Sequence, residues 1–104
     1  MNTYPLRNKD NRTFAFEIEN IYIGINKVAV LLRSAPNVAD IGVRKLFSPV
    51  QDIHIEFTYM GTAFIVWEPF GDNSRYWIGP KDKEHSQINV SALESFFNNT
   101  NHLY

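Results

Sequence analysis

The sequence predicts an α+β fold, in which an antiparallel sheet of four to five strands carries helices packed on one face. Two periodicities support this prediction. Apolar residues alternate with polar ones in several short runs, as in half-buried strands, and recur every three or four residues in two others, as in helices. The chain has 104 residues, of which 44% are hydrophobic, and this fits one domain, 1–104, with its own core.

The first strand is expected after a polar N-terminal arm formed by residues 1–12. Phe14, Phe16 and Ile18 alternate with small or charged residues, which places the three apolar side chains on one face of a strand. The period then changes, because apolar residues from Ile21 to Leu32 recur at spacings of four, three and four. This second spacing predicts a helix.

The predicted helix begins after Asn20, a residue type favoured at N-caps, and ends near Ser34, ahead of Pro36. Gly24 disfavours a helical first turn. Residues 21–25 therefore either start the helix or prolong the preceding strand.

The middle of the chain predicts a meander of four strands at residues 40–47, 53–59, 62–68 and 75–79. Met60-Gly61 is the expected two-residue turn between the second and third of them.

A short second helix is expected to end near Asn98. Two N-terminal signals predict it: a capping box formed by Ser91 and Glu94, or a cap at Asn89 with flanking apolar residues.

The length of the Met60-Gly61 turn decides which residues share a face, because a shift of one position inverts every side chain. A two-residue turn places the following residues on the core face: Ile53, Ile55, Phe57, Tyr59, Phe64 and Val66. The opposite face then receives His54, Glu56, Thr58, Ala63, Ile65 and Trp67. A longer loop would bury charge beside apolar groups, so the short turn is favoured. Trp67 then lies on an exposed apolar patch or in a second small core.

Composition excludes several classes of function. The chain has no cysteine, so it has neither disulfides nor thiolate chemistry. Residues 1–12 contain no signal-peptide run and no segment is long enough to cross a bilayer, which predicts a cytoplasmic protein without membrane contact. Phosphate-loop, serine-hydrolase and basic aromatic motifs are also absent from the sequence. We therefore expect no cofactor and no nucleic-acid partner.

Charge is unevenly distributed along the chain. Residues 1–45 contain seven basic and four acidic residues, a net charge of +3, whereas residues 46–104 contain three and seven, a net charge of −4. An acidic half of this kind favours a basic partner. Ordinary solvation of the surface is the alternative explanation.

The segment 62–80 is dense in Trp, Tyr and Arg, the residue types that often dominate binding energy. It predicts a small non-enzymatic protein-binding domain, of which an immunity or antitoxin protein that inhibits a basic nuclease toxin is one example. The expected partner-binding residues are Glu56, Trp67, Glu68, Phe70, Asp72, Arg75, Tyr76 and Trp77. A charged turn that satisfies its own hydrogen bonds is the alternative interpretation of residues 68–75.

A second hypothesis is a small enzyme or ligand-binding domain with a pocket around His54, Glu56, Trp67 and Arg75. His54 and Glu56 would point the same way from one strand, as a general-base pair does, but no third metal ligand is evident, so no metal is expected. A homodimer is also considered, formed through the edge of strand 75–79 or through the exposed face of the sheet.

Overall fold

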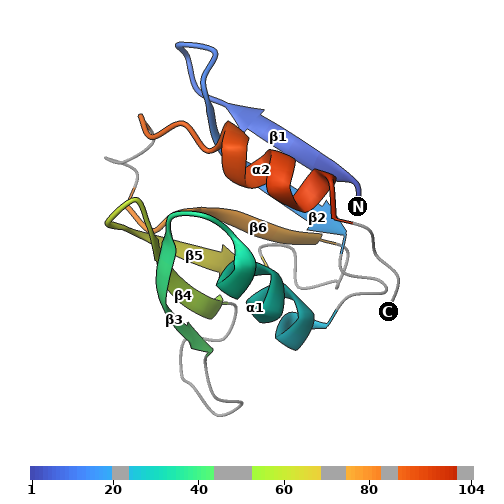
Figure 1. Cartoon of the computed structure of the whole chain (residues 1–104). Coiled ribbons are helices and arrows are strands. Elements are labelled where there is room, and N and C mark those ends of the chain that lie inside the picture. Colours follow the sequence, from blue (N-terminus) through green and yellow to red (C-terminus); the bar gives the residue numbers. More distant parts are fainter. Residues whose placement is uncertain (20–23, 44–52, 69–74, 83–86, 101–104) are drawn as a thin grey trace.

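The computed structural model describes residues 1–19, 24–43, 53–68, 75–82 and 87–100, and within them six strands form one antiparallel sheet (Figure 1). The strand order is β1-β2-β6-β5-β4-β3. The strands are β1 (Thr3–Arg7), β2 (Thr13–Glu19), β3 (Val38–Val43), β4 (Ile53–Tyr59), β5 (Thr62–Trp67) and β6 (Arg75–Pro80). Helix α1 (Ile25–Ser34) follows β2, and α2 (Ser91–Asn98) follows β6. The α+β class is confirmed, but the sheet has more strands than the four to five expected.

The additional strand is β1, which replaces the polar arm expected at residues 1–12. It pairs with β2, and the two are joined by a turn in which the Asn8 side-chain oxygen accepts hydrogen bonds from the amides of Asp10 and Arg12. The Thr3 hydroxyl also donates to the Glu94 carboxylate of α2, at 2.8 Å. The strand escaped prediction because it lies at the sheet edge and buries little apolar surface.

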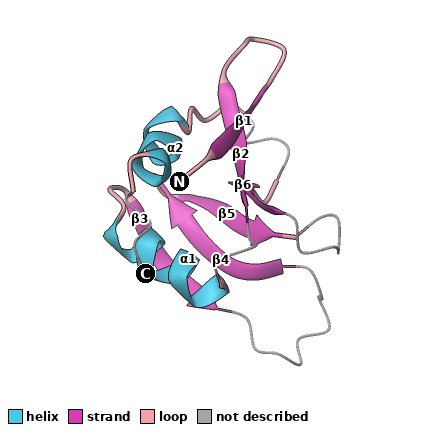
Figure 2. Cartoon of the chain, turned by 90° about the vertical axis from the view of Figure 1, so that its right-hand side faces the viewer, coloured by secondary structure: helices cyan, strands magenta, loops and turns pink. Residues whose placement is uncertain are grey.

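The core lies on one face of the sheet. Strands β2, β4, β5 and β6 contribute its inward side chains: Phe16, Ile18, Ile55, Phe57, Tyr59, Phe64, Val66, Tyr76 and Ile78. The buried stripes of both helices join the same cluster: Val28, Ala29, Leu31, Leu32, Leu93 and Phe97. Helix α1 contacts β3, whereas α2 contacts β1 and β2 (Figure 2). The rings of Phe16 and Phe97 lie 5.5 Å apart and join α2 to the sheet.

The ends of the helices differ from the sequence expectation in their caps. Helix α1 ends at Ser34 as predicted, but it begins at Ile25 with Gly24 as its N-cap. The expected cap Asn20 lies outside the described residues. The N-cap position of α2 is Val90, and no capping box forms between Ser91 and Glu94, whose carboxylate accepts from Thr3 of β1. The alternative cap residue, Asn89, does bind the start of the helix, since its side-chain oxygen accepts from the Ser91 amide at 2.8 Å.

The Met60-Gly61 turn has two residues, as predicted, since Tyr59 pairs with Thr62. Both turn residues have positive φ, 52° and 81°, as a tight hairpin turn requires. The predicted alternation holds from Ile55 onward. It fails before that point, because the register shifts between Ile53 and Ile55 and brings Ile53 opposite Trp67.

The third predicted strand also differs in its bounds. Strand β3 begins at Val38, two residues earlier than expected, and ends at Val43. The rest of the predicted segment 40–47 lies outside the described residues.

Candidate binding surface

Trp67 and Trp77 form a pair on the sheet face opposite the core. They are partners across β5 and β6, their ring centroids are 5.8 Å apart, and their planes are nearly perpendicular at 80°. Both side chains are partly exposed. Trp67 therefore lies where the hairpin predicted, and we call this side of the sheet the tryptophan face.

The six-membered ring of the Trp77 indole lies against Gly79, in space that a side chain at this position would fill. A Cβ at Gly79 would lie 2.6 Å from Cη2 of Trp77 and 2.7 Å from Cβ of Ala15 on β2. Ala15 and Ile65 also lie on this face and are almost fully buried, with exposed fractions of 0% and 7%. The two indoles thus cover a small second core and still present part of their own surface to solvent.

A pocket of about 620 Å³ opens beside the tryptophan pair. Its lining is mostly apolar and comes from four strands and the residues that follow two of them: Arg7, Asn8, Phe14, Ile65, Trp67, Trp77, Pro80 and Lys81. The volume falls within the range of about 300–1,000 Å³ that is typical of small-molecule sites.

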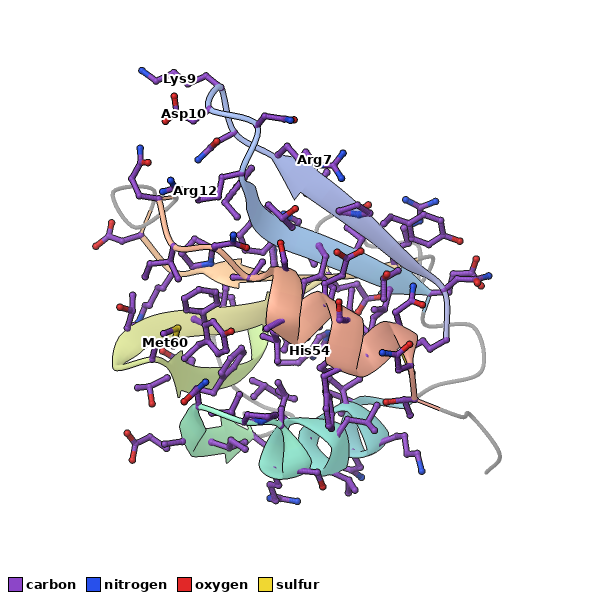
Figure 3. The ribbon with its side chains drawn as sticks, turned by 45° about the horizontal axis from the view of Figure 1, so that its top comes forward. Arg7, Lys9, Asp10, Arg12, His54 and Met60 are labelled. Carbon is purple, nitrogen blue, oxygen red and sulfur yellow. The ribbon has the colours of Figure 1, made fainter. Side chains whose placement is uncertain are left out.

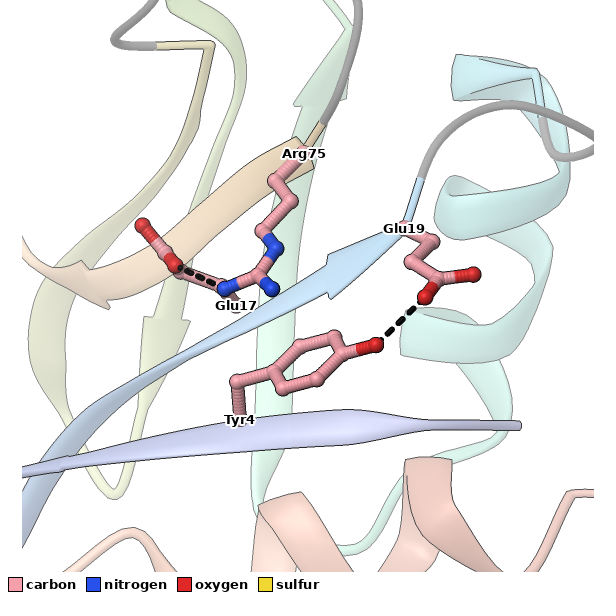
Figure 4. A network of polar contacts seen from close by, with 4 residues as sticks. All are labelled: Tyr4, Glu17, Glu19 and Arg75. Carbon is pink, nitrogen blue, oxygen red and sulfur yellow. Dashed lines mark hydrogen bonds and ion pairs between the residues drawn. The ribbon is translucent and has the colours of Figure 1, made fainter.

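A polar network occupies the end of the tryptophan face where β6 begins (Figure 4). Arg75 Nη1 lies 3.0 Å from Glu17 Oε1, and the guanidinium lies over the Tyr4 ring, 3.7 Å from its centroid. The Tyr4 hydroxyl donates to the Glu19 carboxylate. This hydrogen bond raises the pKa of Tyr4, because deprotonation would remove the donor and place two negative charges together; burial acts in the same direction. One arginine and two carboxylates leave this end with a formal charge of −1.

The opposite end of the tryptophan face carries two cations. Lys81 Nζ lies 2.9 Å from Glu56 Oε1, in an exposed ion pair. Arg7 lies at the end of β1 beside the hairpin turn that also carries Lys9 and Arg12 (Figure 3). The tryptophan face therefore differs along its strands: the Arg75 network has a formal charge of −1, whereas the other end carries Arg7 in addition to the neutral Lys81–Glu56 pair.

The predicted partner-binding residues do not all lie together. Trp67, Trp77, Arg75 and Glu56 share the tryptophan face. Tyr76 is only 7% exposed and belongs to the core, so in this structure it is not a surface anchor. Glu68 lies at the end of β5, where His54 contacts it. Phe70 and Asp72 lie outside the described residues.

Among the described residues, His54 and Glu56, two members of the alternative pocket around His54, Glu56, Trp67 and Arg75, contact other partners than each other. The irregular register at Ile53 lets His54 Nε2 approach Glu68 Oε1 to 2.8 Å, with the His54 ring against that of Tyr76, at 5.9 Å. Glu56 instead pairs with Lys81. His54 and Glu56 thus do not form the predicted pair, and in the described part of the chain no three His, Asp or Glu side chains are placed to hold a metal.

Sequence reasoning missed the residues that β1 and its turn bring to the pocket, Arg7 and Asn8. Two signals could have revealed them: the alternation of Tyr4 and Leu6 with Thr3, Pro5 and Arg7, and the turn-forming run Asn8-Lys9-Asp10-Asn11 before the next strand.

The homodimer considered through the edge of strand 75–79 cannot form in this way, because β6 lies inside the sheet between β2 and β5. The other homodimer considered, through the exposed face of the sheet, stays a prediction. The two edge strands of the described sheet are β1 and β3. Pro5 on β1 lacks an amide donor, and β3 changes register between Ala39 and Gly42. Both features disfavour pairing with another strand.

None of the helices in the described ranges is both long and apolar enough to cross a bilayer. Comparisons with protein-family models, curated proteins and solved structures found no match to this chain.

Proposed function

We propose that this protein is a small non-catalytic domain that binds a protein partner through its tryptophan face. The observation that carries the proposal is the Trp67–Trp77 pair, partly exposed on the sheet face opposite the core. Tryptophans held in a fixed geometry provide a large contact area with little loss of side-chain freedom on binding.

The polar network at Arg75 supports a recognition role for this face. Glu17 and Glu19 lie on β2 next to the tryptophan pair. Glu17 is the cross-strand partner of Trp77, and Glu19 is the cross-strand partner of Arg75. Arg75 balances one of these two carboxylates, so the network retains a negative charge. A basic partner would complement this end and gain an electrostatic increase in its association rate.

An immunity or antitoxin protein that neutralises a basic nuclease toxin is the particular form we propose. The support is the size of the chain, the acidic balance of residues 46–104, and a binding face that needs no chemistry of its own. In this form the partner places a cationic residue near Glu17 and Glu19 and an apolar one against the indoles.

Affinity capture with the purified chain tests this proposal. Immobilised wild-type protein, Trp67→Ala and Trp77→Ala are compared for proteins retained from the native source at low and high salt. Val30→Ala is the matched control, since Val30 is 49% exposed on α1 and lies away from the tryptophan face.

We expect a basic protein that is retained by the wild type and by Val30→Ala and is released by salt. With that protein purified, each tryptophan variant should bind about 30-fold more weakly, equivalent to about 2 kcal/mol, while circular dichroism shows that the fold is kept. Equal affinity of the wild type and both tryptophan variants would refute the proposed surface.

A further inference from the structure

The pocket beside the tryptophan pair combines apolar walls with a positively charged rim. Phe14, Ile65, Trp67, Trp77 and Pro80 form the walls, and Arg7 and Lys81 are the charged members of the lining. No acidic side chain is among the described residues that line it. The pocket therefore offers flat apolar contacts and a positive potential at one end.

Arg7 is the cation most available to a ligand. In the described part of the structure its guanidinium makes no hydrogen bond or ion pair, whereas Lys81 is paired with Glu56 at 2.9 Å. The turn that follows Arg7 is held by the Asn8 side chain, whose oxygen accepts from two backbone amides. This turn fixes the position of the β1 end beside the pocket.

The two indole walls are held in place before any ligand binds. Trp77 lies against Gly79 and Ala15, and Trp67 meets it edge to face. A ligand that stacks on one indole can therefore touch the other as well. Neither tryptophan side chain has to lose conformational freedom when the ligand binds. Such preorganisation raises affinity because less conformational freedom is lost.

We propose that this pocket binds a small planar aromatic carboxylate. The aryl group lies against Trp67 and Trp77, and the carboxylate is bound by the Arg7 guanidinium, whose paired N–H donors match the two oxygens. The volume of about 620 Å³ accommodates a ligand of this size. This inference goes beyond the proposed protein-binding function and does not depend on it. Both use the two indoles, but the carboxylate is bound by Arg7, whereas the charged contacts of a protein partner are expected at the Arg75 network.

A cationic ligand fits the pocket less well. Tryptophan faces attract cations, and this attraction alone would favour an ammonium group. At this end of the face, however, Arg7 repels a positive ligand, and the charge of Lys81 is balanced by Glu56. The rim charges thus select an anion among ligands that stack equally well on the indoles.

The experiment titrates the purified chain with three probes that share one aromatic body: 2-naphthoate, 2-naphthamide and 2-naphthylmethylammonium. The chain has two tryptophans, so its two indole N–H signals in a two-dimensional nitrogen–proton NMR spectrum report directly on the pocket walls. Phenylalanine substitution at Trp67 and at Trp77 assigns the two signals.

We expect 2-naphthoate to shift both indole signals, with an affinity about fivefold higher than that of the amide. Arg7→Gln should remove this preference and leave the amide titration unchanged. Lys9→Gln is the matched control, because it removes the same charge from the adjoining turn without altering the pocket lining. Backbone signals confirm that each variant is folded.

Three outcomes would overturn the inference: no shift of either indole signal at millimolar 2-naphthoate, equal affinity for the acid and the amide, or equal losses in Arg7→Gln and Lys9→Gln. None of them concerns the Arg75 network, and partner capture is measured separately by comparing the wild type with Trp67→Ala and Trp77→Ala. Failure of the ligand site and failure of the protein-binding proposal are thus distinguishable.

Discussion

Substitution of Gly79 by alanine tests how the tryptophan face is built. A Cβ there would lie 2.6 Å from Cη2 of Trp77 and 2.7 Å from the Ala15 Cβ. Carbon atoms in contact normally lie about 3.5–4.0 Å apart, so each neighbour has to move by roughly 1 Å. The indole can swing toward solvent, but Ala15 is fixed to the backbone of β2.

The expected cost follows from these two contacts. Overpacking of this kind destabilises a protein by about 1–3 kcal/mol. Alanine also lowers the conformational entropy of the unfolded chain, which stabilises the folded protein by about 0.4–1 kcal/mol. This gain applies because the φ of Gly79 is not in the left-handed region, so alanine can adopt it. We therefore expect Gly79→Ala to lower the free energy of unfolding by about 1–2 kcal/mol, and the urea midpoint by about 0.5–1 M.

Urea denaturation followed by tryptophan fluorescence measures this effect. Gly42→Ala is the matched control in strand β3, because the nearest atom to its Cβ, the Glu56 carbonyl oxygen, would be 4.0 Å away. Double-mutant cycles with Trp77→Ala and Ala15→Gly separate the two contacts, and each background should reduce the cost of Gly79→Ala. A Gly79→Ala protein as stable as the wild type, or a cost unchanged in both backgrounds, would show that the indole does not rest on Gly79.

Two further predictions concern the hairpin turn and the buried Tyr59. Met60→Asn should raise the free energy of unfolding by about 0.5–1 kcal/mol, because asparagine tolerates the positive φ of 52° at this position better than methionine; an unchanged urea midpoint would contradict this. Burial raises the pKa of Tyr59 above its ordinary value of 10.0, so above about pH 10 the unfolded chain loses this proton first and stability falls as the pH rises. Urea midpoints measured from about pH 8 to about pH 11 should fall less steeply in Tyr59→Phe than in the wild type, and identical slopes would exclude this contribution.

The core hairpin was predictable because its information is local. Residues 55–59 and 64–66 alternate, and the turn between them contains a glycine at a position that requires positive φ. The alternation and the turn together predict on which face of the sheet Trp67 lies, and no information about other strands or helices is needed. The end of α1 ahead of Pro36 was predictable for the same reason.

The candidate site was predictable only in part because its members come from distant strands. The pairing of β6 with β2 places Glu17 beside Trp77 and Ala15 near Gly79, and no local pattern encodes that pairing. The register shift at Ile53 likewise moved His54 away from Glu56 toward Glu68. A slip of one residue changes every neighbour, so pairwise site predictions fail first at such irregularities.

The sequence alone determined the α+β class, the two-residue hairpin and the separation of Trp67 from the main core, since periodicity and turn chemistry are properties of neighbouring residues. The tertiary structure decided that β1 joins the sheet edge, that β6 lies inside the sheet, and that Arg7 and Arg75 occupy opposite ends of the tryptophan face. Strand order depends on which distant segments bury the most apolar surface when they pair. The free energy of that burial comes from contacts between segments far apart in the chain, so the pattern of one segment does not reveal it.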